Sequence, residues 1–322
     1  MPERAALRVI RPGLLTTVQD LGRHGFRRYG MPVAGAMDNL ALRIANRLVG
    51  NPDHAAGLEV TILGPELRFE TDALIAITGA DLSPAVDGVV LPAWTAVAVQ
   101  AGSILTFGGR LSGARAYVAL AGGLDVPLVF GSRSTHLRSR TGGCEGRALV
   151  KGDALIGGDP PADWRNLIGR SIPDSIRPAY RAAPTVRAVL GPQHDAFTAQ
   201  ALETLVGRRY TVLPEADRMG YRLAGPMLPH SGPPDIVSDA TIPGAIQVPA
   251  NQQPILLMAD CQTTGGYPKI AVVISADLPL AAQLMPGDTI GFSLVDVEEA
   301  RAIARTQRAD LDRLLPPVGN RT

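Results

Sequence analysis

The sequence is poor in cysteine, aromatic residues and net charge, and each shortage excludes a class of protein. Its 322 residues include two cysteines, Cys144 and Cys261, and neither belongs to a C-x-x-C pair. This excludes a disulfide scaffold and a cysteine-ligated zinc site, and it suits a reducing compartment. Aromatic residues make up 4% and the net charge is +1. The chain therefore offers neither a base-stacking platform nor a basic field for nucleic acid or an anionic membrane.

Long apolar runs and several familiar site motifs are also missing. No stretch approaches the ~18–20 apolar residues of a membrane span, and no apolar h-region follows Met1-Pro2-Glu3-Arg4. The five histidines form no H-x-x-x-H or H-E-x-x-H pattern, and no Gly-x-Ser-x-Gly elbow occurs. We therefore expect a soluble cytoplasmic protein that has no metal site and no nucleic-acid or membrane partner, and that is not a serine hydrolase.

Abundant, scattered glycine and proline indicate a mainly β fold. Hydrophobic residues are 46% and charged residues 19%, which is typical of a globular chain. The 35 glycines and 27 prolines separate short segments rich in Val, Ile, Leu and Thr, which favour barrels or sandwiches over a doubly wound sheet. The predicted strands are Leu7–Ile10, Leu58–Leu63, Ala73–Thr78, Ala93–Gln100, Ser103–Phe107, Arg115–Leu120, Val186–Leu190, Tyr210–Leu213, Ile255–Ala259, Ile270–Ile274 and Thr289–Leu294.

Three segments have helical patterns and a recognisable start or stop. In Asp38–Val49 the apolar residues recur at i, i+4 and i+8, and Gly50 follows. A second helix is predicted from Asp195 to Gly207. A third is predicted from Asp296 to Leu315, with a glutamate three residues after its start as in a capping box.

The chain also divides into two halves with a weak internal echo. Each half has a strand ended by Leu-Gly-Pro and one helix after an early strand. The stretch 171–184, with three prolines, is predicted to be the linker. We expect two β domains, residues 1–175 and 176–322, the second carrying the C-terminal helix.

The most informative segment is Asp260-Cys261-Gln262-Thr263-Thr264-Gly265-Gly266-Tyr267-Pro268-Lys269. It joins two apolar runs and holds a carboxylate, an amide, two hydroxyls, a phenol and an ammonium around a flexible Gly-Gly. A small polar ligand needs several such converging groups, whereas a plain turn needs one or two. The segment predicts a ligand site, and a polar hairpin is the alternative. Cys261 is interpreted as a buried packing residue in preference to a nucleophile.

Lysine is rare: Lys151 and Lys269 are two of 31 basic residues. A lysine beside Gly-Gly-Tyr-Pro indicates a need for a compact ammonium, which the wide guanidinium fork does not imitate. The alternative is that Lys269 is a solvated strand end.

Three further clusters carry polar groups. Gln19, Asp20 and Arg23 lie in a glycine-punctuated loop, near Asp38, which is interpreted as a helix N-cap. Gly131–His136 contains hydroxyl residues that predict either an anion nest or a loop held by serine side chains, and it lacks the Walker A spacing. Arg218 predicts a carboxylate grip, or an ion pair with a nearby acidic residue such as Asp217 or Glu215.

Six motifs in order resemble one family: Thr17-Val18-Gln19-Asp20-Leu21-Gly22-Arg23, Gly35-Ala36-Met37-Asp38, Gly131-Ser132-Arg133-Ser134-Thr135, Asp217-Arg218-Met219-Gly220, Ile246-Gln247-Val248-Pro249 and Gln262-Thr263-Thr264-Gly265-Gly266-Tyr267-Pro268. They are similar to the biotin-dependent carboxyltransferase, or allophanate hydrolase subunit 2, family. This family includes KipA-type proteins, which act as the C subunit of ATP-dependent 5-oxoprolinase, and the matching half of the urea carboxylase carboxyltransferase domain. The resemblance implies two cyclophilin-like β-barrel domains in tandem.

The resemblance also implies a reaction, with partners. In 5-oxoprolinase, the KipA-type protein works with a KipI-type protein (the B subunit) and a LamB/YcsF-type protein (the A subunit) to open the lactam of 5-oxo-L-proline to L-glutamate. ATP is used at the level of this complex, and the isolated chain is expected to be inactive. A biotinyl lysine has a Met-Lys-Met context, which neither Lys151 nor Lys269 has, so we expect no covalent biotin on this chain.

Roles for individual residues follow from the same resemblance. Lys269 would offset developing negative charge, and Asp20 and Asp260 are the acid/base candidates. The carboxylate and amide of the substrate would be held by Arg218, Gln262, Thr263, Thr264 and Tyr267. Further expected binding residues are Gln19, Arg23, Ser132, Ser134 and Thr135.

Two other functions remain open at this point. One is carboxyl transfer to a urea-like or allophanate-like amide, with biotin delivered by a separate carrier. The other is regulation, in which the chain neutralises a KipI-like partner without catalysis.

Overall fold

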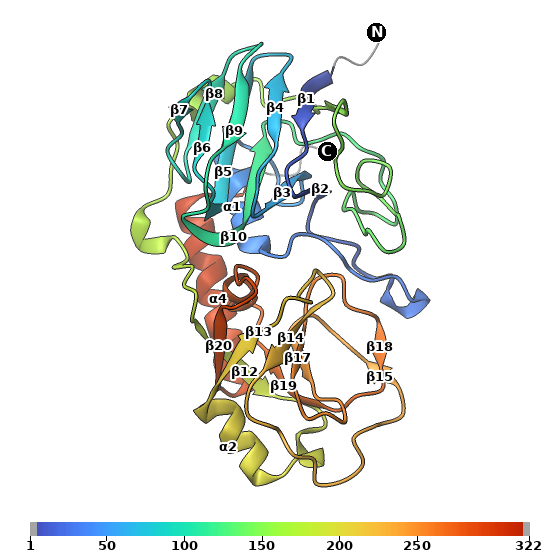
Figure 1. Cartoon of the computed structure of the whole chain (residues 1–322). Helices are drawn as coiled ribbons and strands as arrows, with labels where there is room; N and C mark the ends of the chain where they lie inside the picture. The colour runs from blue at the N-terminus through green and yellow to red at the C-terminus, as the bar shows by residue number, and fades with distance from the viewer. Residues whose placement is uncertain (1–4, 318–322) are drawn as a thin grey trace. The chain divides into compact units, whose positions relative to one another are not determined.

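The computed structural model describes residues 5–317 and is predominantly β, with a few helices (Figure 1). The fold class predicted from the sequence is confirmed. The chain divides into two compact units. Within the described residues, the first unit takes 5–23, 34–178 and 311–317, and the second takes 24–33 and 179–310. The domain boundary between residues 175 and 176 stays a prediction.

The first unit is built from two antiparallel sheets. The six-stranded sheet has the order β11 (Ala154–Ile156), β1 (Ala5–Arg11), β4 (Glu66–Phe69), β9 (Ile104–Phe107), β6 (Pro84–Val86) and β7 (Val89–Val90). The five-stranded sheet has the order β2 (Leu15–Gln19), β3 (Gly57–Thr61), β10 (Ser112–Leu120), β5 (Ala73–Asp81) and β8 (Ala96–Val99).

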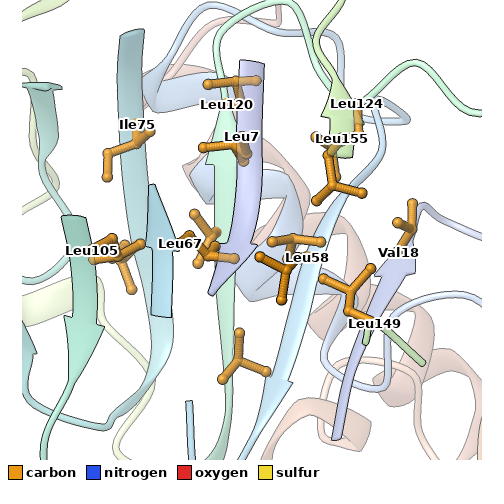
Figure 2. Packing of buried hydrophobic residues seen from close by; sticks show 14 of the residues in the cluster. Leu7, Val18, Leu58, Leu67, Ile75, Leu105, Leu120, Leu124, Leu149 and Leu155 are labelled. Carbon is orange, nitrogen blue, oxygen red and sulfur yellow. The ribbon is translucent and has the colours of Figure 1, made fainter. Parts of the chain in front are cut away.

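The core of this unit draws apolar side chains from both sheets, as Figure 2 shows. Leu7, Leu67 and Leu105 come from the six-stranded sheet, and Leu58 and Ile75 come from the five-stranded one. All five are at most 2% exposed. Burying a leucine or isoleucine side chain fully is worth about 1.5–3 kcal/mol, so this shared core is what holds the two sheets together.

Helix α1 (Asn39–Leu48) covers the other face of the five-stranded sheet, which explains why β5 and β10 are buried on both sides. The hydroxyl of Thr78 on β5 donates to the carbonyl of Ala41 at 2.8 Å. The side chain of Asp38 accepts from the backbone N–H of Ala41 at 2.9 Å, so the predicted N-cap is confirmed. Beyond the helix, Gly50 has φ +76°, which a residue with a side chain rarely adopts.

The second unit contains a closed barrel, and β12 and β20 close it by parallel pairing. Its strand order is β12 (Thr185–Leu190), β19 (Lys269–Val273), β16 (Ala245–Gln247), β17 (Ile255–Leu257), β14 (Gly220–Ala224), β13 (Arg209–Val212) and β20 (Thr289–Leu294). Alternate residues point inward, among them Tyr210, Tyr221 and Phe292, each at most 1% exposed. A separate antiparallel ladder joins β15 (Asp239–Ala240) to β18 (Thr264–Gly265).

Helix α2 (Ala199–Gly207) begins four residues after the predicted start at Asp195, so that start is wrong. The side chain of Thr198 accepts from the N–H of Ala201 and caps the helix. A short helix, α3 (Leu278–Ala281), has no counterpart among the predicted elements. The 3₁₀ turns are η1 (Arg27–Tyr29), η2 (Trp164–Leu167), η3 (Asp174–Ile176) and η4 (His194–Ala196).

The C-terminal helix α4 (Val297–Leu314) agrees with the prediction, and Asp296 accepts from the N–H of Glu299 at 2.8 Å. None of the helices in the described part of the chain is long and apolar enough to cross a membrane. The predicted strands are confirmed, and the missed elements are short or polar. Strand β2 was not predicted: Leu15–Gln19 form a strand, so the loop that was predicted to include Gln19 starts only at Asp20.

Candidate functional site

The carboxylate of Asp20 lies at the centre of the first polar cluster, in the first unit. Asp20 Oδ1 accepts from the hydroxyls of Ser132 (2.6 Å) and Ser134 and from the N–H of Gly22 (2.8 Å). Asp20 Oδ2 accepts from the N–H of Arg133 at 2.6 Å. The hydroxyls of Ser132 and Ser134 and the N–H of Arg133, which could have bound an external anion, thus donate to a carboxylate of the same chain. Asp20 holds the two loops together, and its acid/base role stays a prediction.

Gln19 and Arg23 attach the same loops from either side of Asp20. Gln19 Nε2 donates to Thr17 Oγ1 at 3.0 Å and to the carbonyl of Thr135 at 3.1 Å. Gln19 Oε1 is buried and has no hydrogen-bond partner among the described residues. The guanidinium of Arg23 donates to the carbonyl of Ser134. The structure therefore brings the predicted residues Gln19, Asp20, Arg23, Ser132, Ser134 and Thr135 together.

A buried network that the sequence analysis missed fixes the Gly35–Asp38 motif. Glu59 Oε2 accepts from the Tyr117 hydroxyl at 2.7 Å and from the N–H of Met37 at 2.8 Å. The Tyr117 oxygen in turn accepts from the N–H of Asp38 at 2.7 Å. Burial, with the neighbouring carboxylate of Glu59, raises the pKa of Tyr117 well above its usual value. Cross-strand pairing of Tyr117 with Glu59 creates this contact, which chain position alone does not reveal.

In the second unit, Arg218 and Asp260 form a two-point ion pair. Nε and Nη2 of Arg218 donate to Oδ2 and Oδ1 of Asp260, both at 3.0 Å, and both residues are 5% exposed. The N–H of Asp260 also donates to the carbonyl of Arg218 at 2.8 Å. The acidic partner of Arg218 is thus a residue distant in sequence. Its predicted grip on a substrate carboxylate stays a prediction.

The segment after Asp260 packs its polar groups around Gly265. The amide of Gln247, on β16, donates to the carbonyl of Tyr267 and accepts from Gln262 Nε2, both at 3.4 Å. The hydroxyl of Thr241 donates to the carbonyl of Gln262. A Cβ added to Gly265 would lie 2.7 Å from Gln247 Nε2, so a larger residue here would displace the Gln247 amide. Thr264 and Tyr267 are exposed, whereas Gln247 is buried.

Lys269 ends the segment as a nearly buried cation, 3% exposed, so the alternative of a solvated strand end is wrong. Its Nζ donates to Asp239 Oδ2 at 2.8 Å. Gln193 bridges the pair: its Oε1 accepts from the N–H of Lys269 at 3.2 Å, and its Nε2 donates to Asp239 Oδ2 at 3.1 Å. The hydrogen bond from Lys269 holds the pKa of the Asp239 carboxyl below its usual range.

Cys261 is fully buried and packs with Ala245 and Leu257, as the sequence interpretation expected. Burial raises the pKa of its thiol, which disfavours the thiolate that a nucleophile needs. Among the described residues, no group of three or more His, Cys, Asp or Glu side chains is arranged to hold a metal ion.

The predicted residues of the first unit thus gather around Asp20, whereas those of the second unit include two separate ion pairs, Arg218–Asp260 and Lys269–Asp239. The structure also adds contacting residues that were not among the predicted site residues. Those residues are Gln193, Asp239, Thr241, Gln247 and Glu59. Gln247 belongs to the motif Ile246-Gln247-Val248-Pro249, so the sequence alone could have indicated it as a site residue. Asp239 lies in a two-residue strand without any pattern, and only the ladder with β18 places it beside the polar loop.

Comparison with known proteins gives a full-length match. A family model described as carboxyltransferase domain, subdomain A and B, matches residues 29–294. The C subunit of 5-oxoprolinase from Escherichia coli K12 is 40% identical over 313 residues, covering 96% of this chain and 97% of that protein. The same 5-oxoprolinase component from Haemophilus influenzae is 39% identical and covers 92% of this chain and 94% of that protein.

The second group of relatives is much longer than this chain. Urea amidolyase of Saccharomyces cerevisiae is 33% identical over 95% of this chain, which corresponds to 17% of that protein. The crystal structure of Kluyveromyces lactis urea amidolyase has a TM-score of 0.91 at 31% identity, over 98% of this chain and 20% of that one. The family expected from the six motifs is confirmed: the chain belongs to the carboxyltransferase domain family of subdomains A and B.

Proposed function

We propose that this chain is the C subunit of an ATP-dependent 5-oxoprolinase, which opens the lactam of 5-oxo-L-proline to L-glutamate in a complex with two further proteins. The observation that carries the proposal is the end-to-end match, at 40% identity, with a protein named as the C subunit of 5-oxoprolinase. Urea amidolyase matches at lower identity and with only 17% of its length. The proposed partners are a KipI-type protein and a LamB/YcsF-type protein, which would be the B and A subunits.

The chemistry asks for recognition of a small anionic amide. A five-membered lactam resists hydrolysis, so its carbonyl must be activated, and ATP can supply a phosphoryl group for that purpose in the complex. The loop at 131–135 does not fit a nucleotide phosphate, because its serine hydroxyls and the N–H of Arg133 already donate to Asp20. We therefore assign the ATP site to another subunit of the complex.

The residues of the second unit supply groups of the right chemistry. The ammonium of Lys269 can neutralise a carboxylate or a developing oxyanion. The amides of Gln247 and Gln262 can donate to and accept from a lactam, and the exposed Thr264 and Tyr267 offer hydroxyls. The Arg218–Asp260 pair fixes the start of the loop that carries most of these groups.

Reconstitution tests the proposal. The purified chain should show no ATP hydrolysis that depends on 5-oxoproline, because its described residues supply binding groups but no activated nucleophile. Addition of the KipI-type and LamB/YcsF-type partners should produce glutamate and ADP together. Turnover by the isolated chain, or a reconstituted complex that leaves 5-oxoproline unchanged, would overturn the proposal.

Carboxyl transfer is a second candidate, because urea amidolyase shares the fold over nearly the whole chain. In this case the chain would pass a carboxyl group from a biotin carrier on another protein to a urea-like or allophanate-like amide. Incubation with a carboxybiotin-loaded carrier and urea should then yield a carboxylated product without 5-oxoproline. The two candidates are separated by which of the two substrates is consumed.

A further inference from the structure

Residues 231–240, called the strap below, run alongside the polar loop of the second unit and bond to it. The N–H of Ile236 donates to the carbonyl of Gly266 at 2.8 Å, and β15 at the end of the strap pairs with β18 in the loop (Figure 1). None of the ten strap residues, all of which are described, is buried, and Val237 is 93% exposed. A segment with so little buried apolar surface belongs to the least stable part of a fold and opens easily.

The ion pair between Lys269 and the strap residue Asp239 is asymmetric in its exposure to solvent. The side chain of Lys269 is 3% exposed, whereas that of Asp239 is 48% exposed. A nearly buried ammonium requires a counter-charge, because an unpaired charge in a poorly solvated place is costly. A half-exposed carboxylate can return to water at little cost. Lys269 therefore needs a carboxylate as counter-charge, and a carboxylate other than Asp239 can serve.

Two donors converge on the same oxygen of Asp239. Lys269 Nζ lies 2.8 Å from Asp239 Oδ2, and Gln193 Nε2 lies 3.1 Å from it. Gln193 is itself tied to the N–H of Lys269, at 3.2 Å, so the two donors are fixed relative to each other. A carboxylate that replaced Asp239 would find a charged donor and an amide donor already in position.

We propose that Asp239 is an internal substitute for the carboxylate of the substrate. It neutralises Lys269 in the ligand-free chain, and a small carboxylate ligand displaces it together with the strap. The identity of the ligand as 5-oxoproline rests on the proposed function, whereas the exchange of one carboxylate for another at Lys269 does not. Asp239 thereby becomes a residue that sets affinity for the anionic substrate, and the strap becomes its cover.

The first test removes the competing charge. In the reconstituted complex, Asp239→Asn should lower the KM for 5-oxoproline by up to about fivefold, since a pair with one exposed partner is worth up to about 1 kcal/mol. Asp235→Asn is the matched control: it makes the same charge change in the strap, at a residue that forms no ion pair with any other described residue. Asp239→Asn should give no gain when it is combined with Lys269→Ala.

The second test follows the strap directly by hydrogen–deuterium exchange of the complex. Addition of 5-oxoproline should speed exchange of the Ile236 amide, because its bond to Gly266 is lost when the strap lifts. The matched probe 2-pyrrolidinone has the same lactam without the carboxylate and should leave exchange unchanged. Acetate and malonate test the anion site without any assumption about the lactam.

The outcomes separate this inference from the proposed function. If the complex turns over 5-oxoproline but Asp239→Asn keeps the wild-type KM and strap exchange does not respond, the inference is wrong and the function stands. If 5-oxoproline is not a substrate but small carboxylates still open the strap, the function is wrong and the inference stands. If neither 5-oxoproline nor the simple carboxylates change the hydrogen–deuterium exchange of the strap, the proposed displacement of Asp239 from Lys269 is refuted.

Discussion

Arg218 and Asp260 meet in a two-point ion pair, with both N–O distances 3.0 Å and both side chains 6% exposed. The pair connects the turn before β14 to the start of the polar loop, so it holds one end of the candidate site in place. Replacing the carboxylate removes the charge from this buried contact, at a cost of about 1.5–3 kcal/mol, the worth of a hydrogen bond to a charged group. Asp260→Asn should therefore lower the free energy of unfolding by that amount, as measured by urea denaturation.

The matched control for this prediction is a surface pair of the same chemistry. Arg301 and Glu298 are 63% and 74% exposed, and their contact is 2.6 Å. Glu298→Gln should change stability by less than about 1 kcal/mol. Equal effects of Asp260→Asn and Glu298→Gln would show that the Arg218–Asp260 pair contributes nothing beyond an ordinary surface contact.

Lys269 is predicted to be required for turnover. A charge-assisted contact is worth about 1.5–3 kcal/mol, and about 1.4 kcal/mol corresponds to a tenfold change in rate. Lys269→Ala should therefore reduce turnover of the reconstituted complex by about 10- to 100-fold. Lys269→Arg should recover only part of the loss, because a planar fork does not fit the place of a point-like ammonium. Wild-type activity of Lys269→Ala at saturating substrate would remove Lys269 from the site.

Gly265 and Gly266 make a matched pair for testing the polar cluster. A Cβ at Gly265 would lie 2.7 Å from Gln247 Nε2, whereas the nearest atom to a Cβ at Gly266 is the carbonyl of Ile236 at an ordinary 3.5 Å. Gly265→Ala should displace the Gln247 amide. The KM of the reconstituted complex for 5-oxoproline should then rise several-fold, because a disturbed hydrogen bond costs on the order of 1 kcal/mol. Gly266→Ala should retain wild-type kinetics. The same kinetics for both variants would argue against a role of the Gln247 amide in binding.

Two fully buried tyrosines predict opposite responses to loss of the hydroxyl. The hydroxyl of Tyr210 has no hydrogen-bond partner among the described residues, whereas that of Tyr117 bonds to Glu59 and Asp38. Tyr210→Phe should stabilise the chain by about 1 kcal/mol, because an unsatisfied buried group is removed. Tyr117→Phe should destabilise it by about 1–3 kcal/mol, since Glu59 loses one of its donors and the N–H of Asp38 loses the tyrosine oxygen as acceptor. Thermal unfolding of both variants provides the comparison, and a shared sign would contradict it.

Tyr210 also predicts a loss of stability at alkaline pH. Burial raises its pKa to about 12, from about 10 in an unfolded chain. Between these pH values the unfolded state loses the tyrosine proton more readily than the folded state does. The contribution of Tyr210 to the free energy of unfolding is therefore unchanged below pH ~10 and falls as the pH rises toward 12. Denaturation curves at pH 9 and pH 11 should show a smaller loss for Tyr210→Phe than for wild type. An identical loss in both proteins would refute the assignment to this hydroxyl.

The sequence by itself determined the β class, the first and last helices and the family. Alternating apolar residues, glycine and proline punctuation and capping residues such as Asp38 act over a few neighbours, so their consequences can be read along the chain. The ordered motifs carried the family, which the full-length match confirmed. The start of α2 was misplaced because Thr198, a second capping residue, follows Asp195 closely.

Only the tertiary structure decided which charges and amides meet. The pairing of Arg218 with Asp260, of Lys269 with Asp239 and of Tyr117 with Glu59 joins residues that are far apart in sequence. Burial then decides what these contacts mean: it turns Lys269 from a possible surface cation into one that needs a counter-ion. Such contacts depend on strand register and ladder pairing, which arise from packing of the whole unit and leave no local pattern in the chain.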